Sequence, residues 1–210
     1  NVFRKIVFKN RCDYFVYMSK IFKNEPMSAI THIIGAGLAV ASLVLMIVFA
    51  AIKESTSAWH IVSFSIFGTS LILLYLASGI FHFIKRDTKA KKFFEKLDHS
   101  LIYFLIAGTY TPILLVPLRG ALGWTLFGIV WTIAIIGTIL KLTIKFKVWI
   151  STSLYVLMGW IIIFAINPLI EKLSTSGFLW LLFGGVAYTF GAVFFFIGEK
   201  LDIDVQEDRI

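Results

Sequence analysis

The sequence has little charge and almost no cysteine. Only 15% of its 210 residues are Asp, Glu, Lys or Arg, against about 25% in an average soluble domain. The single cysteine, Cys12, excludes an intramolecular disulfide and a CxxC metal site in this sequence. Apolar residues make up 59% of the chain, and its mean hydropathy is +0.88. This composition is typical of a polytopic membrane protein.

Negative charge is scarcer than positive charge. The 12 Asp and Glu residues are outnumbered by 20 Lys and Arg residues, which gives a net charge of +8. Nucleic-acid binding requires a basic surface on a water-soluble fold, whereas these cations lie in short gaps between long apolar segments. Membrane topology explains them better. We therefore expect the lipid bilayer as a partner and no nucleic acid.

Several stretches are long and apolar enough to span a bilayer, which takes about 20 mostly apolar residues. They cover residues 28–52, 59–84, 98–117, 121–140, 148–168 and 178–198. Short connections predict that consecutive helices pack antiparallel in one all-α, polytopic bundle of six transmembrane helices. We expect three parts along the chain: a basic and aromatic juxtamembrane segment over 1–26, a transmembrane domain over 27–198 and a polar tail over 199–210.

The basic residues also predict an orientation. Most of them lie in the N-terminal segment, in the loops after the second and fourth spans and in the C-terminal tail, all on one side of the membrane. On the other side are Lys53, Arg119 and Lys172. Because Lys and Arg in short loops are retained on the cytoplasmic side, the sequence predicts a cytoplasmic N-terminus.

Small residues and prolines give weaker signals about packing. Gly35 with Ala39, and Ala187 with Gly191, are small-xxx-small pairs that let helices approach closely. Three prolines fall in the later parts of their apolar segments, where we expect a kink or a helix end: Pro112, Pro117 and Pro168.

Ionisable residues gather at the cytoplasmic ends of three predicted spans. His82 lies near that end of the second span, and Asp98 with His99 begins the third. His32 lies within about two turns of the start of the first. Ser78 precedes His82 by one helical turn, so both project from the same helix face. A charged group in the hydrocarbon costs about 2.5–3.5 kcal/mol, so such groups usually face a cavity or a partner.

Two interpretations of these residues are open. Neutral imidazole is a common zinc ligand, and a nearby carboxylate such as Asp98 could orient a metal-bound water or take its proton, as in a metal hydrolase. Alternatively, His82 and Asp98 pair with each other, or with lysines of the loop between them, at the wet edge of the bilayer. Spacing alone does not decide between them.

Five stretches carry a family resemblance: 24-NEPMSAITHIIGA-36, 58-AWHIVSFSIFGTSLILLYLASGIFH-82, 97-LDHSLIYFLIAGTYTP-112, 119-RGALGWTLFGIVW-131 and 154-LYVLMGW-160. Over roughly residues 24–198 the chain closely resembles the bacterial hemolysin III proteins, relatives of the progestin and adiponectin receptors. In that family, and in similar membrane hydrolases such as alkaline ceramidases, Ser-x3-His, a later Asp and a final His-x3-His build an intramembrane zinc site.

The resemblance implies roles for three residues. His82 would be a zinc ligand, Ser78 would complete the first element, and Asp98 would hold the metal-bound water for attack on a lipid amide or ester. The family pattern places the final element at the start of a seventh helix, whereas this chain has 198-GEKLDIDVQEDRI-210 there.

Because catalytic zinc generally has three protein ligands, we expect a truncated or altered C-terminus and an incomplete metal site. His32 and His99 are the other imidazoles on that side of the membrane. Neither is a convincing replacement, since His99 points about 100° away from its neighbour Asp98 around the helix.

The resemblance leaves three functions and the oligomeric state open. The family name implies a hemolysin-like protein with pore-forming or cytolytic activity in the plasma membrane. The alternative is a zinc-dependent lipid amide hydrolase resembling ceramidases, which would act on a lipid substrate. A non-catalytic receptor or lipid-homeostasis role is the second alternative. The helices lack a charged stripe, which counts mildly against a wide aqueous channel.

Overall fold

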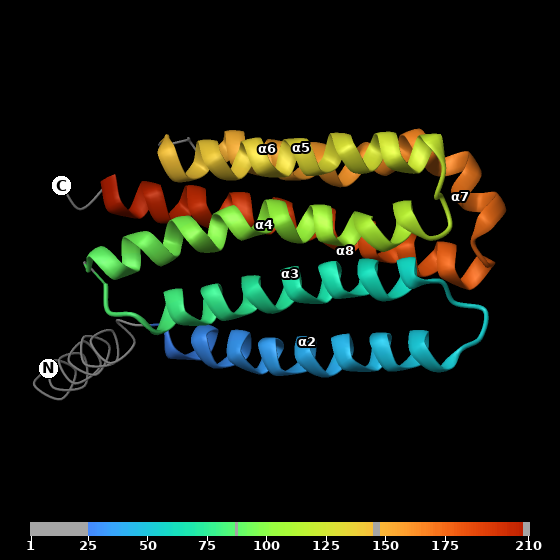
Figure 1. Cartoon of the computed structure of the whole chain (residues 1–210). Coiled ribbons are helices and arrows are strands. Elements are labelled where there is room, and N and C mark those ends of the chain that lie inside the picture. Colours follow the sequence, from blue (N-terminus) through green and yellow to red (C-terminus); the bar gives the residue numbers. More distant parts are fainter. Residues whose placement is uncertain (1–24, 87, 145–147, 208–210) are drawn as a thin grey trace, which may run out of the picture.

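The computed structural model describes residues 25–86, 88–144 and 148–207, and in this part of the chain the ordered elements are all helical. The predicted all-α class is therefore confirmed. The elements are α2 (Pro26–Ile52), α3 (Ala58–Phe83), α4 (Lys89–Leu115), α5 (Ala121–Thr143), α6 (Val148–Trp160), the 3-10 helix η2 (Ile161–Ala165), α7 (Ile166–Lys172) and α8 (Thr175–Glu207). They run back and forth as one bundle of long helices (Figure 1).

The helices fit the predicted membrane bundle. Five segments of the described chain are long and apolar enough to cross a membrane: Pro26–Ile52, Ala58–Phe83, Ala121–Thr143, Trp149–Lys172 and Thr175–Gly198. The remaining long helix, α4, carries several charged residues in its first turns and is apolar only beyond them. The six predicted spans therefore all correspond to helical segments.

Two predicted segments lie partly or wholly beyond these helices. Most of the juxtamembrane segment predicted over 1–26 lies outside the described residues. At the other end, the backbone of the tail predicted over 199–210 continues α8 as far as Glu207.

The helix α4 begins earlier than the sequence predicted, at Lys89 instead of residue 98. Thr88 provides the reason, because its hydroxyl accepts a hydrogen bond from the backbone N–H of Lys91 at 3.1 Å and so caps the helix. The lysines, alanine and glutamate that follow are good helix formers. The charged residues before position 98 therefore belong to the helix, in the part that extends beyond the apolar segment.

The core lies where α4 packs against α5, α6, η2 and α7. Tyr103 and Leu114 of α4 are completely buried, as are Val130 of α5, Ala165 of η2 and Leu169 of α7. Small residues allow this close packing: a Cβ on Gly137 of α5 would come within 2.7 Å of the Tyr103 ring. Close approach through glycine is how membrane helices gain dispersion contacts, because lipid tails are as apolar as the side chains.

The span predicted over 148–168 is broken in two places, at Trp160 and at Ala165. Pro168 lies in α7, past the break, and its nitrogen has no hydrogen to donate to the turn before it. Tyr110 of α4 supplies hydrogen-bond partners for the backbone at this break. Its hydroxyl accepts from the Ile162 N–H at 3.0 Å and donates towards the carbonyls of Met158 at 2.8 Å and Gly159 at 2.6 Å. A neighbouring helix thus satisfies backbone groups that lipid could not.

The last helix is packed very differently. Within Thr175–Gly198 of α8, no side chain is buried. The helix packs mainly on α6, and the hydroxyl of Tyr188 donates to the Tyr155 carbonyl at 2.7 Å. A cavity of about 390 Å³ with a largely apolar lining separates α8 from α4.

Candidate functional site

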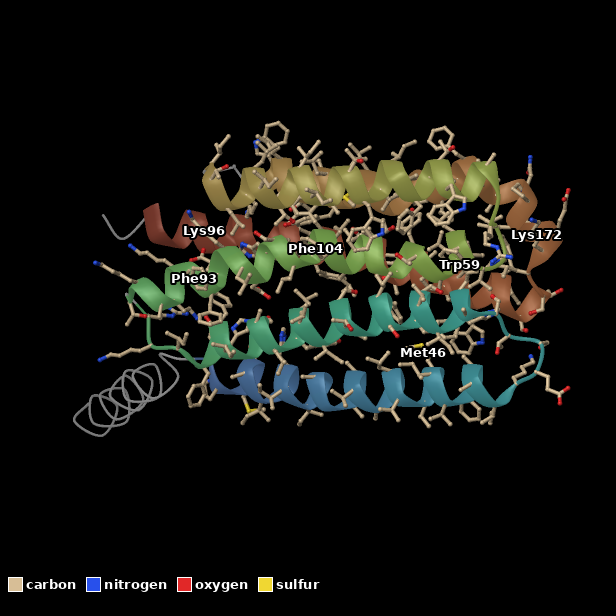
Figure 2. All side chains as sticks on the ribbon, viewed as in Figure 1. Met46, Trp59, Phe93, Lys96, Phe104 and Lys172 are labelled. Atoms are coloured by element: carbon tan, nitrogen blue, oxygen red, sulfur yellow. The ribbon has the colours of Figure 1, made fainter. Side chains whose placement is uncertain are left out.

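Polar side chains concentrate at the end of the bundle where α2 begins and α3 ends. Figure 2 shows Lys96 at this end, and Trp59 and Lys172 at the opposite end. Five residues form what we call the polar cluster: Glu25, His32, Ser78, His82 and Asp98. They come from the start of α2, the end of α3 and the first half of α4.

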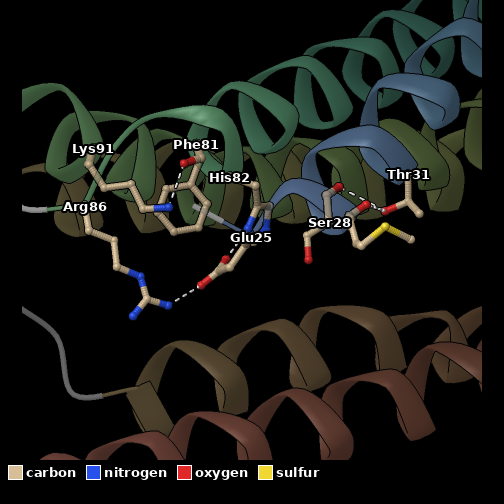
Figure 3. Close-up of polar contacts among 8 residues, drawn as sticks. Glu25, Ser28, Thr31, Phe81, His82, Arg86 and Lys91 are labelled. Atoms are coloured by element: carbon tan, nitrogen blue, oxygen red, sulfur yellow. Dashed lines mark hydrogen bonds and ion pairs between the residues drawn. The ribbon is translucent and has the colours of Figure 1, made fainter. Parts of the chain in front are cut away.

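Glu25 binds the His82 ring directly. Its Oε2 lies 2.6 Å from Nδ1 of His82, and its Oε1 accepts a hydrogen bond from Arg86 at 2.7 Å (Figure 3). Burial by itself would raise the pKa of Glu25, but the hydrogen bonds from Arg86 and His82 outweigh it and hold that pKa below its ordinary value. The carboxylate is therefore the ionised centre of a three-residue contact.

The backbone at Glu25 is unusual. Its φ of 39° places it in the left-handed region, and no other non-glycine residue in the described part of the chain has a positive φ. Pro26 follows directly as the first residue of α2. This turn carries the carboxylate to the end of α3, where it meets His82.

Ser78 and Asp98 meet across the contact between α3 and α4. Ser78 is buried, one turn before His82, and its hydroxyl lies near the Asp98 carboxylate and interacts with it. His82 and Lys91 act on the same carboxylate electrostatically. The structure therefore brings together the three residues that the sequence singled out, and their chemical roles stay predictions.

The two additional histidines lie in different places. The His32 ring packs edge-on against His82 with ring centroids 5.2 Å apart, and its buried Nδ1 has no hydrogen-bond partner among the described residues. His99 instead packs edge-on against Phe195 of α8, with ring centroids 5.8 Å apart. His32 thus belongs to the polar cluster, and His99 faces the last helix.

Metal ligation was predicted for His82, with His32 and His99 as additional candidates. Over the described ranges, no three side chains of His, Cys, Asp or Glu converge closely enough to hold a metal ion. The zinc site stays a prediction, with His82 as its candidate ligand. Glu25 engages Nδ1 of His82, and Nε2 makes no hydrogen bond to the part of the chain that the structure describes.

Lysine side chains tie the helices together around the cluster. The Lys91 ammonium donates to the Phe81 carbonyl at 2.7 Å and lies 3.7 Å from the centre of the Phe81 ring, which joins α4 to the end of α3 (Figure 3). Burial lowers the pKa of Lys91, and the negative charge of Glu25 partly offsets this. Lys96 similarly donates to the Leu142 carbonyl at the end of α5, at 3.2 Å.

Sequence reasoning missed Glu25 and Arg86 as members or supports of the site. A loop lysine beside Asp98 was one of its two open interpretations, and Lys91 is the lysine that acts on this carboxylate. For Glu25 one signal was available, an acidic residue directly before a proline at the start of an apolar span.

Fold and site together define a multi-pass helical membrane protein with a polar cluster near one membrane face. A family model described as Haemolysin-III related matches residues 20–203, and the chain belongs to this family. The resemblance predicted from the sequence is thereby confirmed.

Two relatives at 49% identity are Bacillus proteins. The chain is 49% identical over 185 residues to Hemolysin-3 of Bacillus cereus, covering 88% of this chain and 83% of that protein. It is 49% identical over 174 residues to the Hemolysin-3 homolog of Bacillus subtilis (strain 168), covering 82% and 80%. The Monocyte to macrophage differentiation factor of Homo sapiens is 29% identical over 152 residues, covering 68% and 61%.

Proposed function

We propose that this protein is a lipid hydrolase of the cell membrane and that Ser78, His82 and Asp98 carry its chemistry. One observation supports this most directly: a hydroxyl, an imidazole and a carboxylate from two helices meet at one end of an otherwise apolar bundle. Ionisable groups at such a position are costly, so they are expected to serve a function.

In this proposal, water attacks the carbonyl carbon of a lipid amide or ester. Asp98 orients the water and accepts its proton, and Ser78 holds the carboxylate in place through its hydroxyl. The proton passes to the departing amine or alcohol, and a fatty acid is released. His82 presents its Nε2 to the same site.

Zinc remains part of the proposal because of the family resemblance. His82 would be one ligand, and the further ligands would come from outside the described residues. Metal analysis of the detergent-purified protein tests this separately, since less than stoichiometric zinc would remove the metal from the proposal and leave the three residues in it.

We also propose an orientation of the protein in the membrane. The end of the bundle with the polar cluster would face the cytoplasm, because it collects most of the Lys and Arg residues. Cysteine-accessibility labelling in intact cells, at residues placed singly in the loops at each end, would distinguish the two orientations.

Fatty-acid release from ceramide-like and ester substrates, measured by mass spectrometry on protein in nanodiscs, tests the hydrolase. Loss of the carboxylate in Asp98→Asn should lower the rate by about 10²–10⁴-fold, the usual contribution of a general base. Ser78→Ala should also be slower than its matched control Ser65→Ala, because Ser65 of α3 bonds only to its own helix, at the Ile61 carbonyl. Wild-type release equal to that of Asp98→Asn would refute the hydrolase.

A second candidate is the pore-forming or cytolytic activity that the names of the Bacillus relatives suggest. The unburied, apolar α8 supports it, since such a face suits assembly with further copies. Dye release from liposomes by purified protein is the test: leakage that persists in Asp98→Asn favours a pore, and leakage that needs Asp98 favours lipid hydrolysis. Neither leakage nor hydrolysis would favour a non-catalytic receptor or lipid-homeostasis role.

A further inference from the structure

We infer that Glu25 is a positioning residue for this site: it holds His82 in the tautomer that carries the proton on Nδ1 and leaves Nε2 free. Its importance for catalysis rests on the proposed hydrolase. The contact itself stands on geometry that is independent of any reaction.

The two oxygens of Glu25 have different partners. Oε1 meets Arg86, whose side chain is 56% exposed, whereas Oε2 meets His82, whose side chain is 19% exposed. Arg86 thus anchors the carboxylate from the water side while the second oxygen reaches inwards to the imidazole (Figure 3). An ion pair at the surface would involve Glu25 and Arg86 only, so it does not explain the contact with His82. Surface ion pairs also contribute little to stability.

The chemistry of imidazole turns this contact into a choice of tautomer. A neutral ring has one N–H, and an ionised carboxylate only accepts hydrogen bonds, so the proton must lie on Nδ1 when Glu25 is bound. Nε2 then carries the lone pair that can accept a proton or bind an electrophile. Without Glu25, the ring would be free to exchange tautomers and to rotate.

The backbone supports the same conclusion. Glu25 is held in the left-handed region, which is strained for a non-glycine residue, and such residues cluster at functional sites. A helix start needs no such conformation, because capping residues usually adopt extended backbone angles. The strained turn instead places the carboxylate against His82, a residue 57 positions further along the chain.

Nuclear magnetic resonance of protein labelled with ¹⁵N-histidine tests the inference in detergent micelles or nanodiscs at mildly alkaline pH. The four histidines of the chain make assignment simple, with His82→Gln identifying the relevant signals. In the wild type, His82 should show a protonated Nδ1 and an unprotonated Nε2. In Glu25→Ala this pattern should be lost, whereas Glu25→Gln, which keeps an oxygen acceptor, should retain it.

Ser28→Ala is the matched control, one turn from Glu25 on α2, and it should leave the His82 signals unchanged. A protonated Nδ1 that persists in Glu25→Ala would overturn the inference, as would a wild-type ring protonated on Nε2. If Glu25→Ala misfolds, the wild-type spectrum and the Glu25→Gln variant still test the inference, because Gln keeps the side-chain volume and an oxygen acceptor.

Activity provides the second readout. Glu25→Ala should lower kcat by about 10-fold or more with little change in KM, as expected for a residue that orients a catalytic histidine, and Glu25→Gln should recover part of the loss. An inactive wild type would refute the hydrolase and leave the tautomer result standing. An active enzyme with unchanged kcat in Glu25→Ala would refute the positioning role alone.

Discussion

The helices α4 and α8 both line one cavity and are both rich in apolar residues, yet their packing is opposite. Nine residues of α4 are buried, whereas none is buried in the Thr175–Gly198 part of α8. Hydrophobicity therefore does not decide burial here, because lipid tails solvate an apolar face as well as protein does. What distinguishes α4 is close approach through small residues and the Tyr110 hydroxyl, which bonds to three backbone groups of a neighbouring span, whereas the Tyr188 hydroxyl of α8 bonds to one.

The largest effect should come from Gly123→Ala, where α5 crosses the end of α4. A Cβ at Gly123 would overlap the backbone carbonyl oxygens of Leu114 and Leu118, which cannot rotate away. We expect a loss of about 3 kcal/mol in the free energy of unfolding, measured by thermal denaturation or steric trapping in detergent. Gly128→Ala is the control on the same helix, since nothing lies within 4 Å of its Cβ. Equal losses in the two variants would contradict the close approach.

Next in size should be Tyr110→Phe, which removes the hydroxyl from the helix break. The Ile162 N–H and the carbonyls at Met158 and Gly159 would lose their shared partner, and we expect a loss of about 1–2 kcal/mol. The counterpart on α8 is Tyr188→Phe, which removes one bond to the Tyr155 carbonyl and should cost about 0.6 kcal/mol. A larger cost for Tyr188→Phe would reverse the comparison between the two helices.

Gly108→Ala should cost about 1 kcal/mol, less than Gly123→Ala, because its obstacle is a side chain. The new Cβ would overlap Oγ of Ser70 on α3, which can turn away only by giving up its 2.7 Å bond to the Phe67 carbonyl. The double variant with Ser70→Ala should therefore lose less stability than the sum of the single variants. Strict additivity would show that the two helices do not touch there.

The smallest effect should come from Gly191→Ala on α8. Nothing lies within 4 Å of a Cβ at this position, so the change should be neutral or stabilise the helix by about 0.5–1 kcal/mol through the lower backbone entropy of alanine. A loss as large as that of Gly108→Ala, in the same denaturation assay, would reveal a closely packed partner on α8.

Much of the fold could be predicted from apolar length alone. The six spans could be predicted because each is a long, mostly apolar stretch. The largest errors in the predicted helix ends fall where a polar stretch extends the helix, as residues 89–97 do for α4. The break after Trp160 was not predicted, because the sequence points to Pro168, while the position of the break depends on Tyr110 from another helix. One small-xxx-small pair behaves as expected: Ala39 is buried, and a Cβ on Gly35 would come within 2.8 Å of Tyr75. The other pair, on α8, faces no neighbour in the described chain.

The candidate site could be predicted in part. The spacing of Ser78 and His82 places them on one helix face, and a short loop brings Asp98 opposite them. Residue spacing alone was therefore enough to predict that these three residues lie close together. Residue spacing could not predict the position of Glu25, since its place beside His82 depends on how α2 packs on α3 and on the left-handed backbone conformation of Glu25 itself. The sequence named both His32 and His99 as weak additional candidates, and helix rotation already counted against His99, which packs on Phe195 of α8 and not on His82.

The hydroxyl that fills the helix break has a consequence for biosynthesis. Without Tyr110, the peptide groups around Ile162 have no partner in lipid, so the single span formed by α6, η2 and α7 would enter the bilayer at a penalty. The ribosome delivers α4 first. The helix that supplies the Tyr110 hydroxyl is therefore synthesised before the span that depends on it. A circular permutant in which α6 is synthesised before α4 would insert poorly even though its final contacts are the same.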